Sequence, residues 1–124
     1  MMRDTGAPGD NRAIVVVSSV RALGVRPGRL PYSVSKAGLN QLVRMAAYEL
    51  GPLGIRVNAL SPGLTATDLS LSNPEFFEEQ AALLPLGRAG QPAEMGEVAL
   101  FLVSPASTFM TGANVAVDGG ESLW

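Results

Sequence analysis

The sequence contains the stretch Ala13-Ile14-Val15-Val16-Val17 near its amino end, and this stretch decides the fold. Every residue in it is apolar, most are β-branched, and no polar residue interrupts the run. Such a run is typical of a strand in a parallel sheet that is covered by helices. We therefore predict a strand over residues 13–17 that is buried on both faces and ends at Ser18 and Ser19.

A helical pattern follows, from Pro31 to the stop signal Gly51-Pro52. With 100° of rotation per residue, one stripe of this helix is suited to packing on the sheet. The stripe consists of Tyr32, Lys36, Leu39, Val43, Ala46, Ala47 and Leu50. The opposite side is also rather apolar, with Val34, Gly38, Leu42, Met45 and Tyr48. We therefore expect the helix to be covered on both sides.

The rest of the chain continues the alternation of strands and helices. A second strand is predicted over residues 55–60, and with the helix before it this strand forms a parallel βαβ unit. Two helices follow, one from Pro74 to about Leu84 with Asn73 as its cap, and one from near Pro92 to just before Pro105. A last strand covers residues 114–117. The fold class is therefore α/β, with about three parallel strands under helices.

The composition excludes several classes of function. The chain has 124 residues, which suits one domain or part of one, and a net charge of -2 without a run of like charge. No nucleic-acid or membrane surface is therefore predicted. The sequence contains no Cys and no His, which excludes a disulfide framework, a Ser-His-Asp triad and a His/Cys zinc site. We predict no metal site.

The same composition bears on location. The absence of cysteine fits a reducing compartment, and no apolar signal region follows Met1. The apolar run over residues 98–103 is too short to span a bilayer. We therefore expect a cytoplasmic protein.

Residues that can do chemistry gather at one edge of the predicted sheet. Ser19 follows the first strand, Ser61-Pro62-Gly63 ends the second, and Tyr32 opens the helix between them. Ligands of parallel sheets bind beyond the carboxyl ends of the strands. Each residue also has a structural interpretation: Ser19 and Pro62-Gly63 as turn residues, Tyr32 as a packing residue, and Thr65 and Thr67 as loop hydroxyls.

Tyr32 and Lys36 form the most informative pair. They are four residues apart, which places them on one face of the helix, and Lys36 is the only lysine of the chain. An isolated phenol ionises near pH 10, and a cation about 4 Å away contributes on the order of 4 kcal/mol to the phenolate. Tyr32 could then exchange a proton with a substrate oxygen, to which Ser19 would donate a hydrogen bond.

Together these residues resemble the short-chain dehydrogenase/reductase family, in particular its classical branch, which includes the 3-oxoacyl-carrier-protein reductases. The resemblance runs over residues 12–120. Its motifs, in the family's order, are Ile14-Val15-Val16-Val17-Ser18-Ser19, Tyr32-Ser33-Val34-Ser35-Lys36-Ala37, Arg56-Val57-Asn58-Ala59-Leu60-Ser61-Pro62-Gly63, Pro85-Leu86-Gly87-Arg88, Gly90-Gln91-Pro92-Ala93-Glu94, Phe101-Leu102, Thr111-Gly112 and Val117-Asp118-Gly119-Gly120.

The resemblance implies roles for these residues. Tyr32 would be the proton donor and acceptor, Lys36 would favour its phenolate form and bind the nicotinamide ribose, and Ser19 would position the substrate oxygen. Pro62 and Gly63 form the family's turn beside the cofactor, and Thr65 and Thr67 fall where the family holds the nicotinamide carboxamide. The catalytic set is thus Ser19, Tyr32 and Lys36. The cofactor-binding set is Tyr32, Lys36, Pro62, Gly63, Thr65 and Thr67.

The family's first half has no counterpart before Ser19. The sequence there contains no Thr-Gly-x-x-x-Gly-x-Gly phosphate turn and no Asn-Asn-Ala-Gly segment. We interpret residues 1–124 as a partial domain, with a polar leader over 1–12 and a catalytic half over 13–124. In the terms of the family, this is the carboxyl-terminal half of a doubly wound, Rossmann-like domain. We expect the chain alone to be inactive and to leave the strand over residues 13–17 as an unpaired apolar edge of the sheet.

Two functions remain open. The first is an NAD- or NADP-dependent oxidoreductase that interconverts a small-molecule alcohol and a carbonyl by hydride transfer and is a homo-oligomer, dimer or tetramer, at full length. The second is a non-catalytic remnant or interaction module that self-associates through the 31–50 helix. The substrate is equally open: Leu69, Leu71, Phe76 and Phe77 form either an apolar substrate face or the core side of a short helix.

Overall fold

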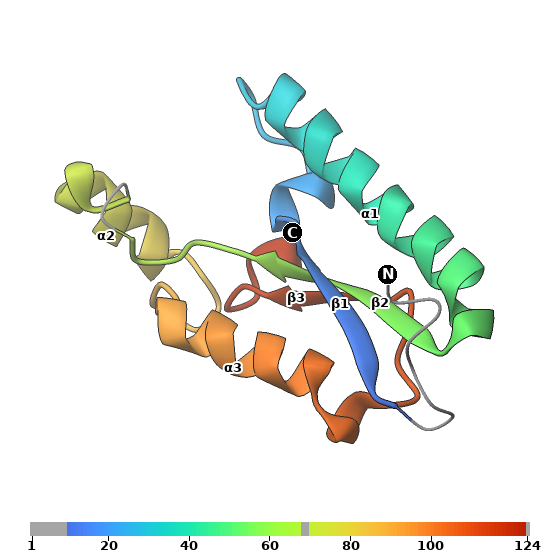
Figure 1. Ribbon diagram of the computed structural model, residues 1–124. Helices are drawn as coiled ribbons and strands as arrows, with labels where there is room; N and C mark the ends of the chain where they lie inside the picture. Colours follow the sequence, from blue (N-terminus) through green and yellow to red (C-terminus); the bar gives the residue numbers. More distant parts are fainter. Residues whose placement is uncertain (1–9, 68–69, 124) are drawn as a thin grey trace.

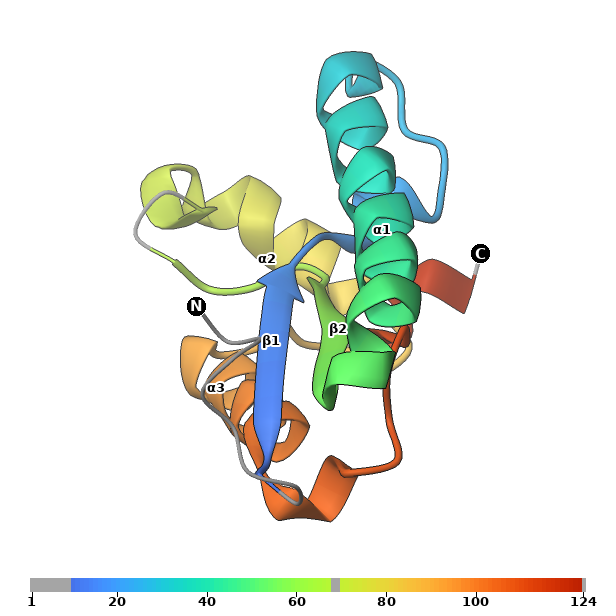
Figure 2. The ribbon, with the colours of Figure 1, turned by 45° about the vertical axis from the view of Figure 1, so that its right-hand side comes forward.

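The computed structural model describes residues 10–67 and 70–123. Within them three parallel strands form one sheet in the order β1-β2-β3, with β1 over Arg12–Val17, β2 over Ile55–Pro62 and β3 over Asn114–Val117. Helix α1 (Leu30–Leu50) covers one face of the sheet and α3 (Pro92–Val103) covers the other, as Figures 1 and 2 show. The Rossmann-like α/β class is confirmed.

The shorter elements lie mostly at the two ends of the strands. Helix α2 (Pro74–Ala82) lies beyond the carboxyl end of β2 (Figure 1). Single 3₁₀ turns complete the chain: η1 over Val20–Ala22, η2 over Gly51–Leu53, η3 over Ser70–Ser72, η4 over Pro105–Ser107 and η5 over Glu121–Leu123. Of the predicted polar leader, residues 1–9 lie outside the described residues.

The predicted elements are all present, with small shifts at their ends. β1 begins one residue earlier than predicted, and β2 continues through Ser61 and Pro62 because both pair with β3. The expected parallel βαβ unit is confirmed by the register of β1 and β2, which aligns Val17 with Leu60. Asn73 caps α2 as predicted, since its side-chain oxygen accepts the N–H of Phe76 at 3.4 Å.

The core lies between α1 and the central strand. Ile55, Val57 and Ala59 of β2 are almost fully buried against Val43 and Ala47 of α1. Burying a side chain such as Ile55 or Val57 stabilises the fold by about 1.5–3 kcal/mol. The inward stripe predicted for the helix is therefore correct at its centre.

Several motif residues hold the amino side of β3 in place. The buried Asn58 side chain donates to the carbonyl of Met110 at 2.9 Å and accepts the N–H of Ala113 at 3.0 Å. Thr111 accepts the N–H of Val57 at 3.0 Å, and the N–H of Gly112 donates to the carbonyl of Val57 at 2.7 Å. These motifs thus build the scaffold and lie away from the carboxyl ends of the strands.

The strand over 13–17 is not buried on both faces in this chain, and it lies at the open edge of the sheet, as expected for the chain alone. β1 is an edge strand that pairs only with β2 among the described residues, so its apolar side chains are half-buried and Val17 is 56% exposed. On the outer side of α1, Val34, Leu42, Met45 and Tyr48 are exposed in the single chain, so the expected cover of this side stays a prediction. The deeply buried strand is instead β2, because it has a partner on each side.

The amino end of α1 also differs from the expected inward stripe. Tyr32 is 45% exposed, because this end of the helix extends past the carboxyl ends of the strands (Figure 2). Tyr32 lines a cavity together with residues that follow β1 and end β2. In the described part of the chain, no helix is both long enough and apolar enough to cross a membrane.

The exposed side of α1 leads to a first prediction. A full-length protein that carries this chain should self-associate through α1. Leu42 and Met45 are half exposed on the outer side of this helix, and burying such apolar side chains in an interface stabilises a complex. Leu42→Glu combined with Met45→Glu should lower the mass measured by light scattering. The control is the double variant Val25→Glu with Phe109→Glu, two apolar residues that are exposed away from α1, and it should not lower the mass. Equal masses for the two double variants would show that the interface does not lie on α1.

Candidate functional site

The carboxyl ends of β1 and β2 and the start of α1 meet around one cavity of about 300 Å³. It is lined by Ser19, Val20, Arg21, Arg29, Tyr32, Pro62, Gly63, Leu64 and Thr65. Five residues predicted from the sequence are thus brought together from three separate segments. Lys36 lies behind Tyr32 and does not line the cavity. Thr67 is exposed farther along the loop and does not line it either.

The two serines after β1 have different roles. The hydroxyl of Ser18 donates to the carbonyl of Lys36 at 3.2 Å and so attaches α1 to the end of β1. The oxygen of Ser19 caps η1 by accepting the N–H of Arg21 at 3.1 Å. Since a hydroxyl has one proton to donate besides its lone pairs, this cap leaves the Ser19 proton for a ligand in the cavity.

Lys36 is held between the end of β1 and the ring of Tyr32. Its ammonium donates to the carbonyl of Val17 at 3.4 Å and lies 5.7 Å from the centroid of the Tyr32 ring. This distance is within the range of a cation–π contact. The four-residue spacing therefore places the only lysine of the sequence beside the tyrosine, as predicted.

Gly63 forms the floor of the cavity, where the chain leaves β2. A Cβ atom there would lie 2.6 Å from the Cβ of Asp118 and 2.7 Å from a carboxylate oxygen of Glu121, so only glycine fits. The hydroxyl of Thr65 donates to the carbonyl of Gly63 at 2.9 Å. On the far side, Ala66 and Leu64 pair with Gly90 through backbone hydrogen bonds of 2.9 Å each. The backbone after β2 is thus fixed on both sides.

Sequence reasoning missed Glu121. Its carboxylate is only 3% exposed, forms an ion pair with Arg21, lies 3.6 Å from Arg26 and accepts the N–H of Leu64 at 2.9 Å. It therefore joins the segment after Ser19 to the segment after Gly63. The one signal in the sequence is a charged residue directly after the Gly119-Gly120 turn, where the resemblance ends.

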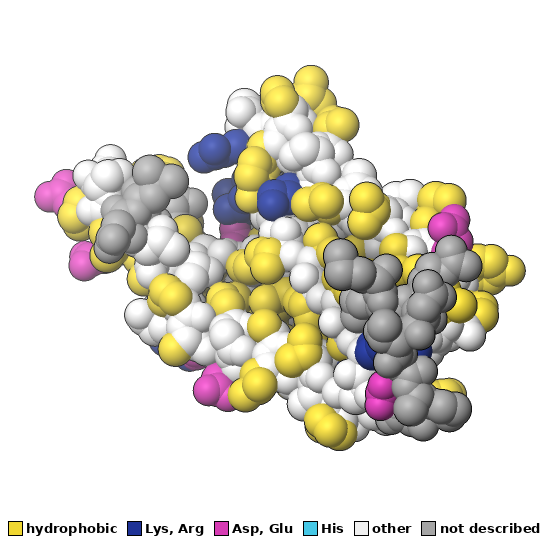
Figure 3. All heavy atoms as spheres, in the orientation of Figure 1, with side chains coloured by type: hydrophobic (Ala, Val, Ile, Leu, Met, Phe, Trp, Pro, Cys, Tyr) yellow, Lys and Arg dark blue, Asp and Glu magenta, His cyan; other side chains and the backbone are white. Residues whose placement is uncertain are grey.

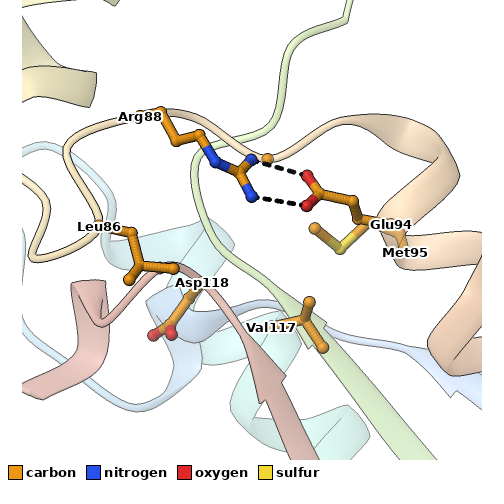
Figure 4. A pocket seen from close by; sticks show the side chains of 8 residues that line it. Leu86, Arg88, Glu94, Met95, Val117 and Asp118 are labelled. Carbon is orange, nitrogen blue, oxygen red and sulfur yellow. Dashed lines mark hydrogen bonds and ion pairs between the residues drawn. The ribbon is translucent and has the colours of Figure 1, made fainter.

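Arg88 and Glu94 form an ion pair that holds the loop around Gly90, which pairs with the backbone after Gly63 (Figure 4). The guanidinium makes two hydrogen bonds of 2.8 and 2.9 Å to the carboxylate, which also accepts the N–H of Gln91 at 2.7 Å in the capping box of α3. They flank a small cavity of about 90 Å³ beside Val117 and Asp118. The hydrogen bonds from Arg88, and after them that from Gln91, lower the pKa of Glu94 to about 2.

This ion pair predicts an acid-sensitive part of the stability. The pKa of Glu94 is about 2 in the folded chain and lies below its ordinary value of 4.5. The ionised carboxylate therefore stabilises the fold above pH 4.5, and this contribution is lost as the pH falls through about 2. Glu94→Gln should lower the free energy of unfolding near neutral pH, and the difference from the unaltered chain should shrink over that window.

Urea denaturation at a series of pH values measures this difference. Glu97→Gln is the matched control, because Glu97 is exposed on the same helix and has no ion pair with a described residue. A difference for Glu94→Gln that stays constant down to acidic pH would contradict the assignment.

The comparisons with known proteins agree with this geometry. A family model described as enoyl-(acyl carrier protein) reductase matches residues 2–122. Galactitol 2-dehydrogenase (L-tagatose-forming) of Cereibacter sphaeroides is 47% identical over 75% of this chain and 38% of its own length. The 3-oxoacyl-[acyl-carrier-protein] reductase of Thermotoga maritima is 42% identical over 89% of this chain and 45% of its own.

A solved structure is similar over the same region. The NADPH-bound short chain oxidoreductase of Pseudomonas aeruginosa PAO1, described as containing an atypical catalytic center, has a TM-score of 0.81 and 36% identity over 88% of this chain and 45% of its own. The chain thus spans less than half the length of each of these proteins. It belongs to the short-chain dehydrogenase/reductase family, as the motifs around Ser19, Tyr32 and Lys36 predict.

Proposed function

We propose that this chain is the catalytic half of an NAD(P)-dependent oxidoreductase that interconverts an alcohol and a carbonyl by hydride transfer. One observation carries the proposal: Ser19, Tyr32 and the Pro62-Gly63 turn line a single cavity, with the Lys36 ammonium beside the Tyr32 ring. The small size of the cavity, about 300 Å³, suits a small-molecule substrate. Cytoplasmic location, predicted from the composition, is part of this proposal.

Tyr32, Ser19 and Lys36 would have different roles in proton transfer. The Tyr32 hydroxyl would give a proton to the carbonyl oxygen in reduction and take it back in oxidation. The Ser19 hydroxyl would donate a hydrogen bond to that oxygen, since Ser19 only accepts in its hydrogen bond with the N–H of Arg21. Lys36 would hold a positive charge beside Tyr32, since its ammonium donates to the carbonyl of Val17 and lies 5.7 Å from the centroid of the Tyr32 ring.

The floor of the cavity fits the nicotinamide end of a dinucleotide. Pro62, Gly63 and Thr65 line the cavity at the end of β2, with Tyr32 among the other lining residues. Lys36 lies beside Tyr32, and Thr67 lies farther along the loop. These residues would hold the ring and its ribose, and the bound dinucleotide supplies the hydride. The relatives support this choice of cofactor, since the similar Pseudomonas aeruginosa oxidoreductase was solved with NADPH. NAD and NADP both remain candidates.

A non-catalytic interaction module is the second candidate. It is favoured by the exposed side of α1 and by the open edge of β1 in the described part of the chain. Association of such a module would depend on an apolar surface and not on the Tyr32 hydroxyl. Replacing that hydroxyl therefore separates the two candidates.

Tyr32→Phe should lower turnover at least about 100-fold in a full-length protein that carries this chain, because the proton donor is lost while the ring remains. The circular dichroism spectrum should not change. Tyr48→Phe is the matched control: Tyr48 is the other tyrosine, lies on the same helix and is 86% exposed. Turnover that survives Tyr32→Phe, or falls equally in both variants, would remove Tyr32 from the proposed role.

The 124-residue chain by itself should not bind NAD(H) or NADP(H) at micromolar concentration and should not turn over. The pyrophosphate of a dinucleotide is held by a glycine-rich turn and a helix amino end, and the sequence before Ser19 contains no such turn. Isothermal titration with both cofactors on folded chain measures this. Micromolar binding would show that the nicotinamide side of the site is sufficient.

A further inference from the structure

Three arginines gather beside the candidate site. Arg21, Arg26 and Arg29 line a second cavity of about 460 Å³, whose opposite wall comes from α2. This cavity shares Arg21, Arg29 and Leu64 with the one that contains Ser19 and Tyr32, so the two adjoin. Figure 3 shows basic side chains gathered on this face, between the amino end of α1 and α2. We call the larger cavity the arginine cleft.

The arginine cleft carries an excess of positive charge. Among its described lining residues, Glu121 is the only carboxylate, and it is already engaged by Arg21, by Arg26 at 3.6 Å and by the N–H of Leu64. Arg29 forms no ion pair with a described residue. Because the chain as a whole has a net charge of -2, this local excess is not a consequence of a basic composition. An anion placed here would find the Arg29 guanidinium, which has no ion-pair partner in the part of the chain that the structure describes.

The position of Arg29 strengthens this attraction. Arg29 is the N-cap of α1, where no side chain caps the helix and no acidic residue lies in the first turn. The partial positive charge at the start of this 21-residue helix is therefore not compensated by the helix itself. Arg29 and the helix end attract the same anion.

The opposite wall of the arginine cleft is mostly apolar, with Gln80 as its one polar side chain among the described lining residues. Phe76, Leu83 and Leu84 come from α2 and the turn after it, and Phe76 is 58% exposed. Its neighbour Phe77 instead packs in a small core with Ala81 and Ala89. The core-side interpretation therefore holds for Phe77, while Phe76 faces the cleft. Leu69, which belonged to the predicted apolar face, lies outside the described residues.

We propose that the arginine cleft binds the acidic group of an organic anion that has an apolar body. A carboxylate or phosphate would lie against Arg29 and Arg26, and the apolar part against Phe76 and Leu83. The reacting oxygen would then point through the shared wall toward Ser19 and Tyr32, which is the step that rests on the proposed function. The substrate class is thus an acidic alcohol or ketone.

Three probes of equal chain length test this cleft without cofactor or turnover. Hexanoate, hexyl phosphate and 1-hexanol are titrated into the full chain, and binding is followed by the backbone amide NMR signals around Arg26, Arg29 and Phe76. At least one anion should bind more tightly than hexanol, and its affinity should fall as sodium chloride is added. The anion that binds more tightly identifies the acidic group as carboxylate or phosphate.

Arg29→Gln should weaken the binding of that anion about tenfold, because a charge-assisted hydrogen bond is lost. Arg26→Gln should weaken it too, and serves as a second test if the first variant unfolds. Arg44→Gln is the matched control: it makes the same change in net charge at an exposed position of α1 that does not line the cleft, and the affinity should stay the same.

Two results would overturn the proposal: anions that bind no more tightly than hexanol, or equal losses in Arg29→Gln and Arg44→Gln. Either result would leave the proposed oxidoreductase function standing, since that function is tested by Tyr32→Phe. Conversely, turnover that persists in Tyr32→Phe would refute the proposed function without affecting the measured binding of an anion.

Discussion

The structure depends on the parallel pairing of β2 with a strand on each side. Because β1 and β3 both run parallel to β2, the three carboxyl ends reach the same side of the sheet. The pairing continues past the ends of β1 and β2. The N–H of Ser18 donates to the carbonyl of Leu60 at 2.7 Å, and the N–H of Gly63 donates to the carbonyl of Val117 at 3.1 Å. The register of β2 thereby fixes the positions of Ser19, Gly63 and Asp118 relative to one another.

Glu121 extends this constraint beyond the sheet. A carboxylate removed from water is stable only when it is paired and hydrogen-bonded, and Glu121 satisfies this with Arg21 and the N–H of Leu64. Its position depends on Gly120, whose φ of +91° and close approach to Pro85 exclude a side chain. The last turn of the described chain therefore holds together the two loops that form the cavity.

The sequence predicted the elements well and their burial less well. Periodicity and Pro/Gly signals located α1, α2, α3 and β3 within a few residues, because these signals act locally. Burial depends on neighbours, so the apolar run of β1 by itself predicts a strand buried on both faces. Its edge position could be predicted only from the missing counterpart of the family's first half. Glu121 was missed for the same reason: its partners Arg21, Arg26 and Leu64 are all distant in sequence.

The cavity with Ser19 and Gly63 and the arginine cleft differ in how much their residues can vary, and this difference bears on the proposed substrate specificity. Ser19 is buried and hydrogen-bonded, and Gly63 has no space for a side chain, so the end of the cavity that they line tolerates little change. Arg29 and Phe76 are exposed and belong to segments outside the sheet. Side chains on such segments can change without disturbing the scaffold. If the proposed chemistry is conferred by the strand ends, then the choice among substrates lies in the segment before α1 and in α2, which is where the arginine cleft has its charge and its apolar wall.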